Sequence, residues 1–148
     1  NTSKVTDMSG MFSSSKVTTL NLSSFDTSKV TNMSNMFSSS VATEIKGLEK
    51  FNTSKVTDMN GMFSSSKVTT LNLSSFDTSK VTDMSNMFYG SKATTLDLSS
   101  FDTSNVTNMI QMFWNSKITT GYARTQEDAD RFNASSHKPS TLTFVVKS

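Results

Sequence analysis

Apolar residues recur along the chain with a fixed period. A valine stands at Val5, Val30, Val56, Val81 and Val106, at intervals of 25, 26, 25 and 25 residues. A period of this length is typical of repeat proteins, and it predicts five units. Three further columns keep the same phase: Met8, Met33, Met59, Met84 and Met109; Met11, Met36, Met62, Met87 and Met112; and Phe12, Phe37, Phe63, Phe88 and Phe113.

Within one unit the apolar residues have helical spacing. Val30, Met33, Met36 and Phe37 stand at i, i+3, i+6 and i+7, which places them on one side of a short helix of about two turns. An Asn or Asp precedes this segment in every unit, where its side chain can cap the first turn or form an Asx-turn; calcium ligation is the alternative. These residues are Asn1, Asp26, Asn52, Asp77 and Asp102.

The second half of each unit has strand spacing. In the segment VTTLNLSSF, residues 17–25, Leu20 and Leu22 alternate with the polar Asn21. One short helix and one short strand cannot bury their apolar sides alone, so the units are expected to stack. The prediction is an α/β repeat solenoid, with short parallel strands on one face and short helices on the other. The interior leucine columns are Leu20, Leu71 and Leu96, and Leu22, Leu73 and Leu98.

Unit two departs from this pattern. Its segment VATEIKGLEKF, residues 41–51, is one residue longer than the others, and Gly47 is the expected bulge that restores the phase. Charged residues replace small ones at Glu44, Lys46, Glu49 and Lys50. Two interpretations remain open, a solvated charged strand and a local ligand contact.

The end of the chain is not repetitive. Residues 125–136 are predicted to form a helix, with Thr125 and Asp128 as a capping box, and residues 142–146 a final strand. Solenoids need terminal caps for solubility. The chain is therefore predicted to contain five stacked repeats in residues 1–120 and a C-terminal cap in residues 121–148.

This cap is also expected to cover an apolar change in unit five. Ile110 replaces the Ser or Asn of other units, and Trp114 stands in the column of Ser13, Ser38, Ser64 and Tyr89. Two large apolar side chains at polar positions need a neighbouring segment to shield them from water.

Composition narrows the function classes. Only 34% of the 148 residues are hydrophobic, against about 45–50% apolar in typical domains, but their phasing indicates a folded protein. The net charge is +2, and the lysines are spread over the units, so neither nucleic-acid binding nor a basic membrane-binding patch is predicted. With no cysteine the chain has no disulfide, thiol nucleophile or cysteine zinc site. No apolar run approaches the ~20 residues of a membrane span.

Catalytic patterns are also missing. His137 is the only histidine, it is expected at the surface, and a histidine triad or a multi-histidine metal site needs more. The acidic residues recur with the period of the repeat, and no glycine-rich phosphate loop occurs. We therefore predict that the protein is not an enzyme and uses no cofactor or metal.

Five phased copies of VTxMxxMF, together with strand segments such as KATTLDLSS at 92–100, resemble the repeat of BspA-like leucine-rich-repeat surface proteins of bacteria. The resemblance extends over essentially the whole chain. It implies an extracellular protein of the bacterial cell surface, anchored through a segment outside this sequence, that adheres to a host or matrix protein or to a glycan. The family has no agreed binding residues. A phenylalanine (Phe25, Phe76, Phe101) stands where leucine-rich repeats have a buried asparagine.

The strand face is the predicted contact surface, because short polar side chains along it suit a wet contact with a protein or glycan. The alternative is a structural spacer that holds another domain away from the cell surface. An ordered-water or ice-binding face is disfavoured, since the unit lacks a strict outward TxT. The candidate ligand-binding residues are Glu44, Lys46, Glu49, Lys50, Thr70, Asn72, Thr95, Asp97 and Tyr122.

Overall fold

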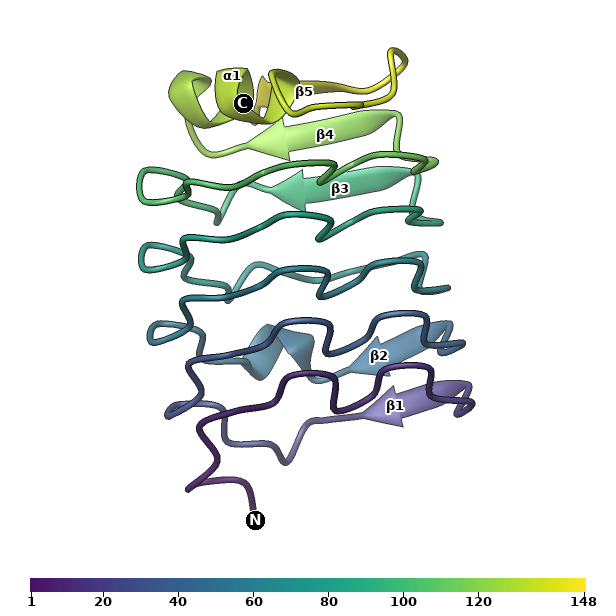
Figure 1. Ribbon diagram of the computed structural model, residues 1–148, viewed down its shortest axis with the longest axis vertical. Helices are drawn as coiled ribbons and strands as arrows, with labels where there is room; N and C mark the ends of the chain where they lie inside the picture. The colour runs from purple at the N-terminus through teal and green to yellow at the C-terminus, as the bar shows by residue number, and fades with distance from the viewer.

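The computed structural model describes residues 1–148 as a stack of coils (Figure 1), with the N-terminus at one end and the last helix and strand at the other. The elements, in chain order, are β1 (Thr19–Asn21), β2 (Glu44–Lys46), the 3-10 helix η1 (Leu48–Lys50), β3 (Thr95–Leu98), β4 (Thr120–Ala123), α1 (Gln126–Asn133) and β5 (Thr143–Val146).

The strands form two separate parallel sheets. In the first, β1 pairs with β2, and Leu20 lies opposite Ile45. In the second, β3 pairs with β4 and β4 with β5, so that Leu96, Gly121 and Phe144 lie side by side. Between the sheets, residues 69–72 of unit three form no strand. The predicted strand is therefore wrong for this unit, and Leu71 is only half-buried.

The predicted short helices are wrong as well, because the VTxMxxMF segments form turns. One residue in each segment has φ between 55° and 62°, a left-handed conformation that a right-handed helix excludes. The main-chain groups bond to the next unit instead: Phe37 N donates to Met62 O at 2.8 Å, and Phe63 N to Met87 O at 2.9 Å. The left-handed residues are Gly10, Asn35, Gly61, Asn86 and Gln111.

The turn side of the stack is thus bonded from coil to coil like a sheet. Isolated parallel bridges link Asp7, Asn32, Asp58, Asp83 and Asn108 in succession. A series of turns places residues i and i+3 on one side much as a helix does, which is why the spacing agreed with both. The wider assignment to the leucine-rich-repeat-like solenoids, and the division of the chain at residue 120, stay predictions.

The interior of the stack contains the predicted apolar columns. The valine, second methionine and phenylalanine columns are buried in the middle units, with Phe37 and Phe88 at 0% exposure. The phenylalanine rings from Phe12 to Phe113 stack at centroid distances of 5.3 to 6.1 Å. Met11, at 42% exposure, is an exception at the N-terminal end.

The Asx column supports the main chain, as predicted. Each Oδ1 accepts a hydrogen bond from the N–H two residues later, for example Asp77 from Ser79 at 3.0 Å. The threonine that follows each Asx holds the next coil: Thr78 Oγ1 donates to Asp102 O and accepts from Asp102 N, both at 2.8 Å. The same pair of bonds joins Thr2 to Asp26, Thr27 to Asn52, and Thr53 to Asp77.

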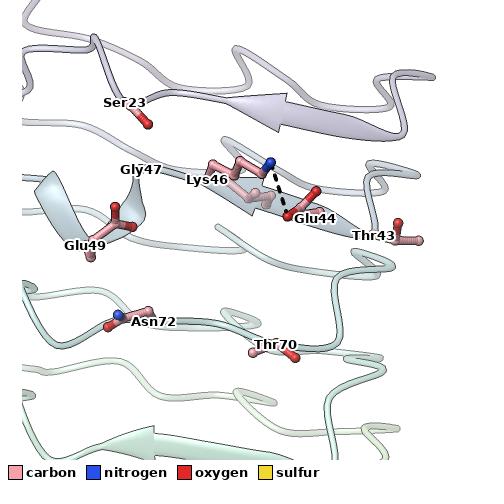
Figure 2. Close-up of a pocket in the computed structure, with 9 residues that line it drawn as sticks. Ser23, Thr43, Glu44, Lys46, Gly47, Glu49, Thr70 and Asn72 are labelled. Atoms are coloured by element: carbon pink, nitrogen blue, oxygen red, sulfur yellow. Dashed lines mark ion pairs between the residues drawn. The ribbon is translucent and has the colours of Figure 1, made fainter.

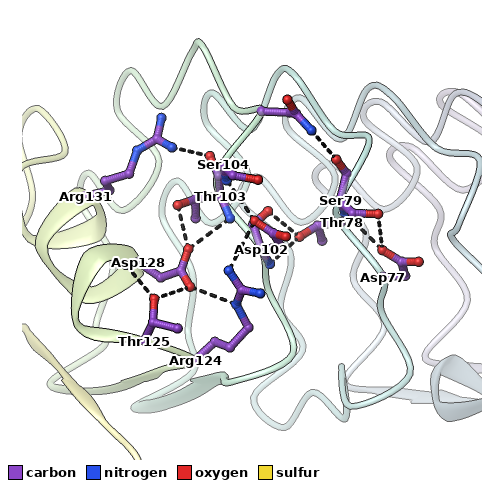
Figure 3. A network of polar contacts seen from close by, with 11 residues as sticks. Asp77, Thr78, Ser79, Asp102, Thr103, Ser104, Arg124, Thr125, Asp128 and Arg131 are labelled. Atoms are coloured by element: carbon purple, nitrogen blue, oxygen red, sulfur yellow. Dashed lines mark hydrogen bonds and ion pairs between the residues drawn. The ribbon is translucent and has the colours of Figure 1, made fainter.

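The C-terminal segment ends this series of threonine contacts with a side chain (Figure 3). Asp128 Oδ1 accepts from Thr103 N at 3.0 Å and from Thr103 Oγ1 at 2.7 Å, in place of a further coil. Asp128 Oδ2 accepts from Arg124 Nε at 2.9 Å. The predicted capping box is present in part: Thr125 Oγ1 accepts from Asp128 N at 3.1 Å, and Asp128 Oδ2 accepts from Thr125 Oγ1 instead of from Thr125 N. Arg131 adds donors to the carbonyl groups of Thr103 and Val106.

The cap does not cover the apolar change of unit five. Ile110 is 59% exposed and Trp114 is 40% exposed. His137, itself exposed as expected, stacks on Trp114 at 4.9 Å, and Tyr89 meets the Trp114 ring edge-on at 5.8 Å. The expectation that the tail shields both side chains is therefore wrong for Ile110, and His137 covers Trp114 only in part. The helix α1 and the strand β5 pack on Phe113 instead.

Candidate strand-face site

A hollow of about 590 Å³ opens on the strand face between β2 and unit three (Figure 2). Five of the predicted contact residues line it together, although they come from two units of the chain: Glu44, Lys46, Glu49, Thr70 and Asn72. The other lining residues are Ser23, Thr43, Ile45 and Gly47, and Ile45 is the only apolar side chain among all nine.

The charged side chains of this hollow remain accessible to a ligand. Glu44 Oε1 and Lys46 Nζ are 3.6 Å apart, and each side chain is more than half exposed. Exposed pairs of this kind contribute only about 0–1 kcal/mol, so a partner can displace the contact at small cost. Glu49 is exposed and forms no ion pair.

Gly47 draws β2 towards unit one and thereby shapes the hollow. Its φ is 96°, and a Cβ at this position would lie 2.5 Å from Ser23 N. Any other residue would therefore clash with the main chain of unit one. Gly47 also begins the 3-10 helix η1, so the extra residue of unit two is accommodated by a left-handed turn. The expected β-bulge at Gly47 is therefore wrong: this glycine is a left-handed residue between the end of β2 and the 3-10 helix η1.

Two of the predicted contact residues, Asn72 and Asp97, already form hydrogen bonds within the protein. Asn72 Oδ1 accepts from Ser74 N at 3.2 Å and from Ser74 Oγ at 2.7 Å, which leaves the Asn72 amide nitrogen as the group that faces a ligand. Asp97 makes the same turn with Ser99. Thr70 is exposed, and its hydroxyl forms no hydrogen bond within the protein.

Thr95 and Asp97 belong to a second hollow of about 360 Å³, which Thr70 and Leu71 also line. Lys147 Nζ donates to Asp97 Oδ2 at 2.6 Å and lies 5.7 Å from the centre of the Tyr122 ring. Partial burial raises the pKa of Asp97, but hydrogen bonds from Lys147 and Ser99 outweigh it, and the net pKa is lowered.

Most of the predicted contact residues thus line one or both of the two hollows. Two of them, Tyr122 and Lys50, lie outside both. Tyr122 is opposite Asp97 in the β3–β4 register and borders neither hollow. Lys50 is exposed on η1 outside both hollows. Sequence reasoning missed Lys147, although the signal was present: it stands two residues beyond Val145, so it continues the outward face of the last strand.

Comparison of the sequence with known protein families identifies the family of this chain. The sequence matches the family described as "Mycoplasma protein of unknown function, DUF285" over residues 1–44 and 38–142. The chain belongs to this family. No curated protein and no solved structure matches it.

The strand face of this DUF285 protein offers hydrogen-bonding groups of every type. The first hollow presents hydroxyl, amide, carboxylate and ammonium groups, and its single apolar side chain gives little surface for an apolar ligand. Such a lining recognises polar partners through direct and water-mediated bonds. None of the helices is long and apolar enough to cross a membrane.

Proposed function

We propose that this DUF285 protein is a non-catalytic, leucine-rich-repeat module of the BspA-like type, located on the bacterial cell surface. In this proposal it adheres to a host or extracellular macromolecule, a protein or a glycan, through its strand face. The first hollow, with Glu44, Lys46 and Glu49, forms the centre of the contact.

One observation carries the proposal. Three of the four charged residues at which unit two breaks the repeat, Glu44, Lys46 and Glu49, lie around one hollow, together with Thr70 and Asn72 of unit three. Charged side chains that only solvate a strand have no reason to border a concave surface between two units. The hollow's volume of about 590 Å³ falls within the ~300–1,000 Å³ of ligand sites.

The alternative is a structural spacer, and the regularity of the turn side favours it. Parallel bridges run without interruption from Asp7 to Asn108, and the phenylalanine stack follows them. A stack held along its whole length can keep a neighbouring domain at a fixed distance.

Neutralising the charges of the first hollow separates the two functions. The variant Glu44→Gln, Lys46→Gln, Glu49→Gln and Lys50→Gln keeps the net charge, because two positive and two negative groups are removed. Beads coated with the protein, tested on immobilised matrix proteins and mucin glycans, should lose adhesion by tenfold or more while the melting curve stays within about 0.5 kcal/mol of the unmodified protein.

A matched control carries four exposed charge changes elsewhere: Lys55→Gln, Lys80→Gln, Glu127→Gln and Asp130→Asn. This control should adhere like the unmodified protein. Full adhesion by the hollow variant would contradict the proposed contact surface. Absence of adhesion by the unmodified protein to any of the surfaces would favour the spacer.

A further inference from the structure

The main-chain groups of residues 69–72 form no main-chain hydrogen bonds. The equivalents of residues 70–72 in the other four units lie in β1, β2, β3 and β4. In unit three, the N–H and C=O groups of residues 69–72 form no hydrogen bond with any other part of the main chain, either within the unit or to β2 and β3. Thr69, Thr70 and Asn72 are exposed residues, so water reaches this segment.

The opening is fixed by the coils around it. At one end Lys67 N donates to Ser40 O at 3.1 Å, and at the other Ser75 Oγ donates to Leu48 O at 3.0 Å. On the turn side, Asp58 is bridged to Asn32 and to Asp83. Unit three is therefore bonded to unit two at both ends of this segment, and to units two and four on the turn side. The interruption is a preformed feature of the stack.

Hollows flank the segment on both sides. The larger one separates it from β2 (Figure 2), and the second lies between it and β3. Thr70 borders both hollows, and no aromatic ring lines either. The segment thus presents its main-chain groups inside a concave and polar surface.

We propose that residues 69–72 bind an extended segment of a partner polypeptide through main-chain hydrogen bonds. This inference rests on the proposed function, because it names the partner class of the same strand face. An extended chain is the ligand that matches alternating N–H and C=O groups at strand spacing, as in other cases of strand addition.

The charges of the larger hollow indicate which polypeptides bind best. It contains the carboxylates of Glu44 and Glu49 and the single ammonium group of Lys46. The excess negative charge favours a segment that carries a basic side chain. Main-chain bonds give affinity without a fixed sequence, so partners of varied sequence are expected.

The probe is an immobilised library of octapeptides that each contain one Lys or Arg. The tightest binder is then synthesised with N-methyl groups on alternate peptide nitrogens, in each of the two possible registers. Methylation in the register that faces residues 69–72 should weaken binding roughly tenfold or more, because it removes several donors, while the other register serves as the matched control. Amide exchange of residues 69–72 should slow when the unmethylated peptide binds.

Equal affinity of both methylated peptides, or unchanged exchange at residues 69–72, would overturn the inference. So would a library without any binder. If mucin glycans still bind and the charge-neutralised variant loses them, the proposed strand-face function stands and only the polypeptide assignment fails. Loss of all binding by the unmodified protein removes both.

Discussion

Leu71 and Leu96 occupy the same position in consecutive units but have different surroundings. Leu96 is 1% exposed within the second sheet, whereas Leu71 is half-buried where the sheets separate. Their local sequences, VTTLNLSS and ATTLDLSS, are almost the same. Residue type and spacing predict both as core, and only the contacts with neighbouring units distinguish them.

The two leucines should therefore differ in their contribution to stability. Leu96→Ala should cost about 2–5 kcal/mol, as for a buried large-to-small change. Leu71→Ala should cost about 1–2 kcal/mol, because the half-buried side chain of Leu71 buries less apolar surface than that of Leu96. Urea unfolding of both variants measures the difference, and equal costs would contradict the separation of the sheets at unit three.

At the scale of the elements, the turns and the C-terminal helix show which signals are local. Gly10, Gly61, Asn35 and Asn86 stand at left-handed positions, and their residue types argued against a helix that the apolar spacing favoured. Helix α1 was predictable because its N-terminal cap is a local signal: Thr125 and Asp128 are three residues apart in the sequence. The contact of Asp128 with the threonine of unit five was not, since it joins residues 25 apart.

Asp128 should make the stability of the protein depend on acid pH. Burial raises the pKa of this carboxyl group, but hydrogen bonds from Thr103, Thr125 and Arg124 lower it to about 2. A folded pKa below the unfolded value of about 3.9 gives stability that is complete above pH 4 and is lost as the pH falls towards 2. The loss should be about 2 kcal/mol.

Thermal melts between pH 5 and pH 2 test this, with Asp128→Asn as the variant and the exposed Asp130→Asn as its control. Asp128→Asn should be less stable at pH 5 by about 1–3 kcal/mol, because buried donors lose a charged acceptor. Its stability should fall less steeply with acid than that of the unmodified protein. A curve parallel to that of the control would show that Asp128 does not carry the effect.

At the scale of the whole molecule, the period predicts the number of units and their parallel stacking, but not the interruption of the sheet. Residues 53–76 repeat residues 2–25 with a single change, Ser9 to Asn60. The first copy forms β1, and the second forms no strand. Because the two sequences are almost the same, the difference comes from the neighbouring coils and not from the local sequence.

Amide exchange should show this division in the free protein. The amides of residues 69–72 lack main-chain acceptors and should exchange orders of magnitude faster than the amides of β3 that bond to β4. Nuclear magnetic resonance resolves these positions individually. Similar protection in both segments would indicate one continuous sheet.

The threonine contacts between coils have a consequence for how such chains change in length. Thr27 is bonded to Asn52, 25 residues later, by the same two bonds that Thr53 and Thr78 make with residues 24 positions later. An added residue is therefore tolerated inside a coil while the junction stays unchanged. Every unit contains the threonine that bonds to the next coil, so duplication of one unit in the gene lengthens the stack with the same kind of junction. A carboxylate such as Asp128, bonded to the last of these threonines, ends the series.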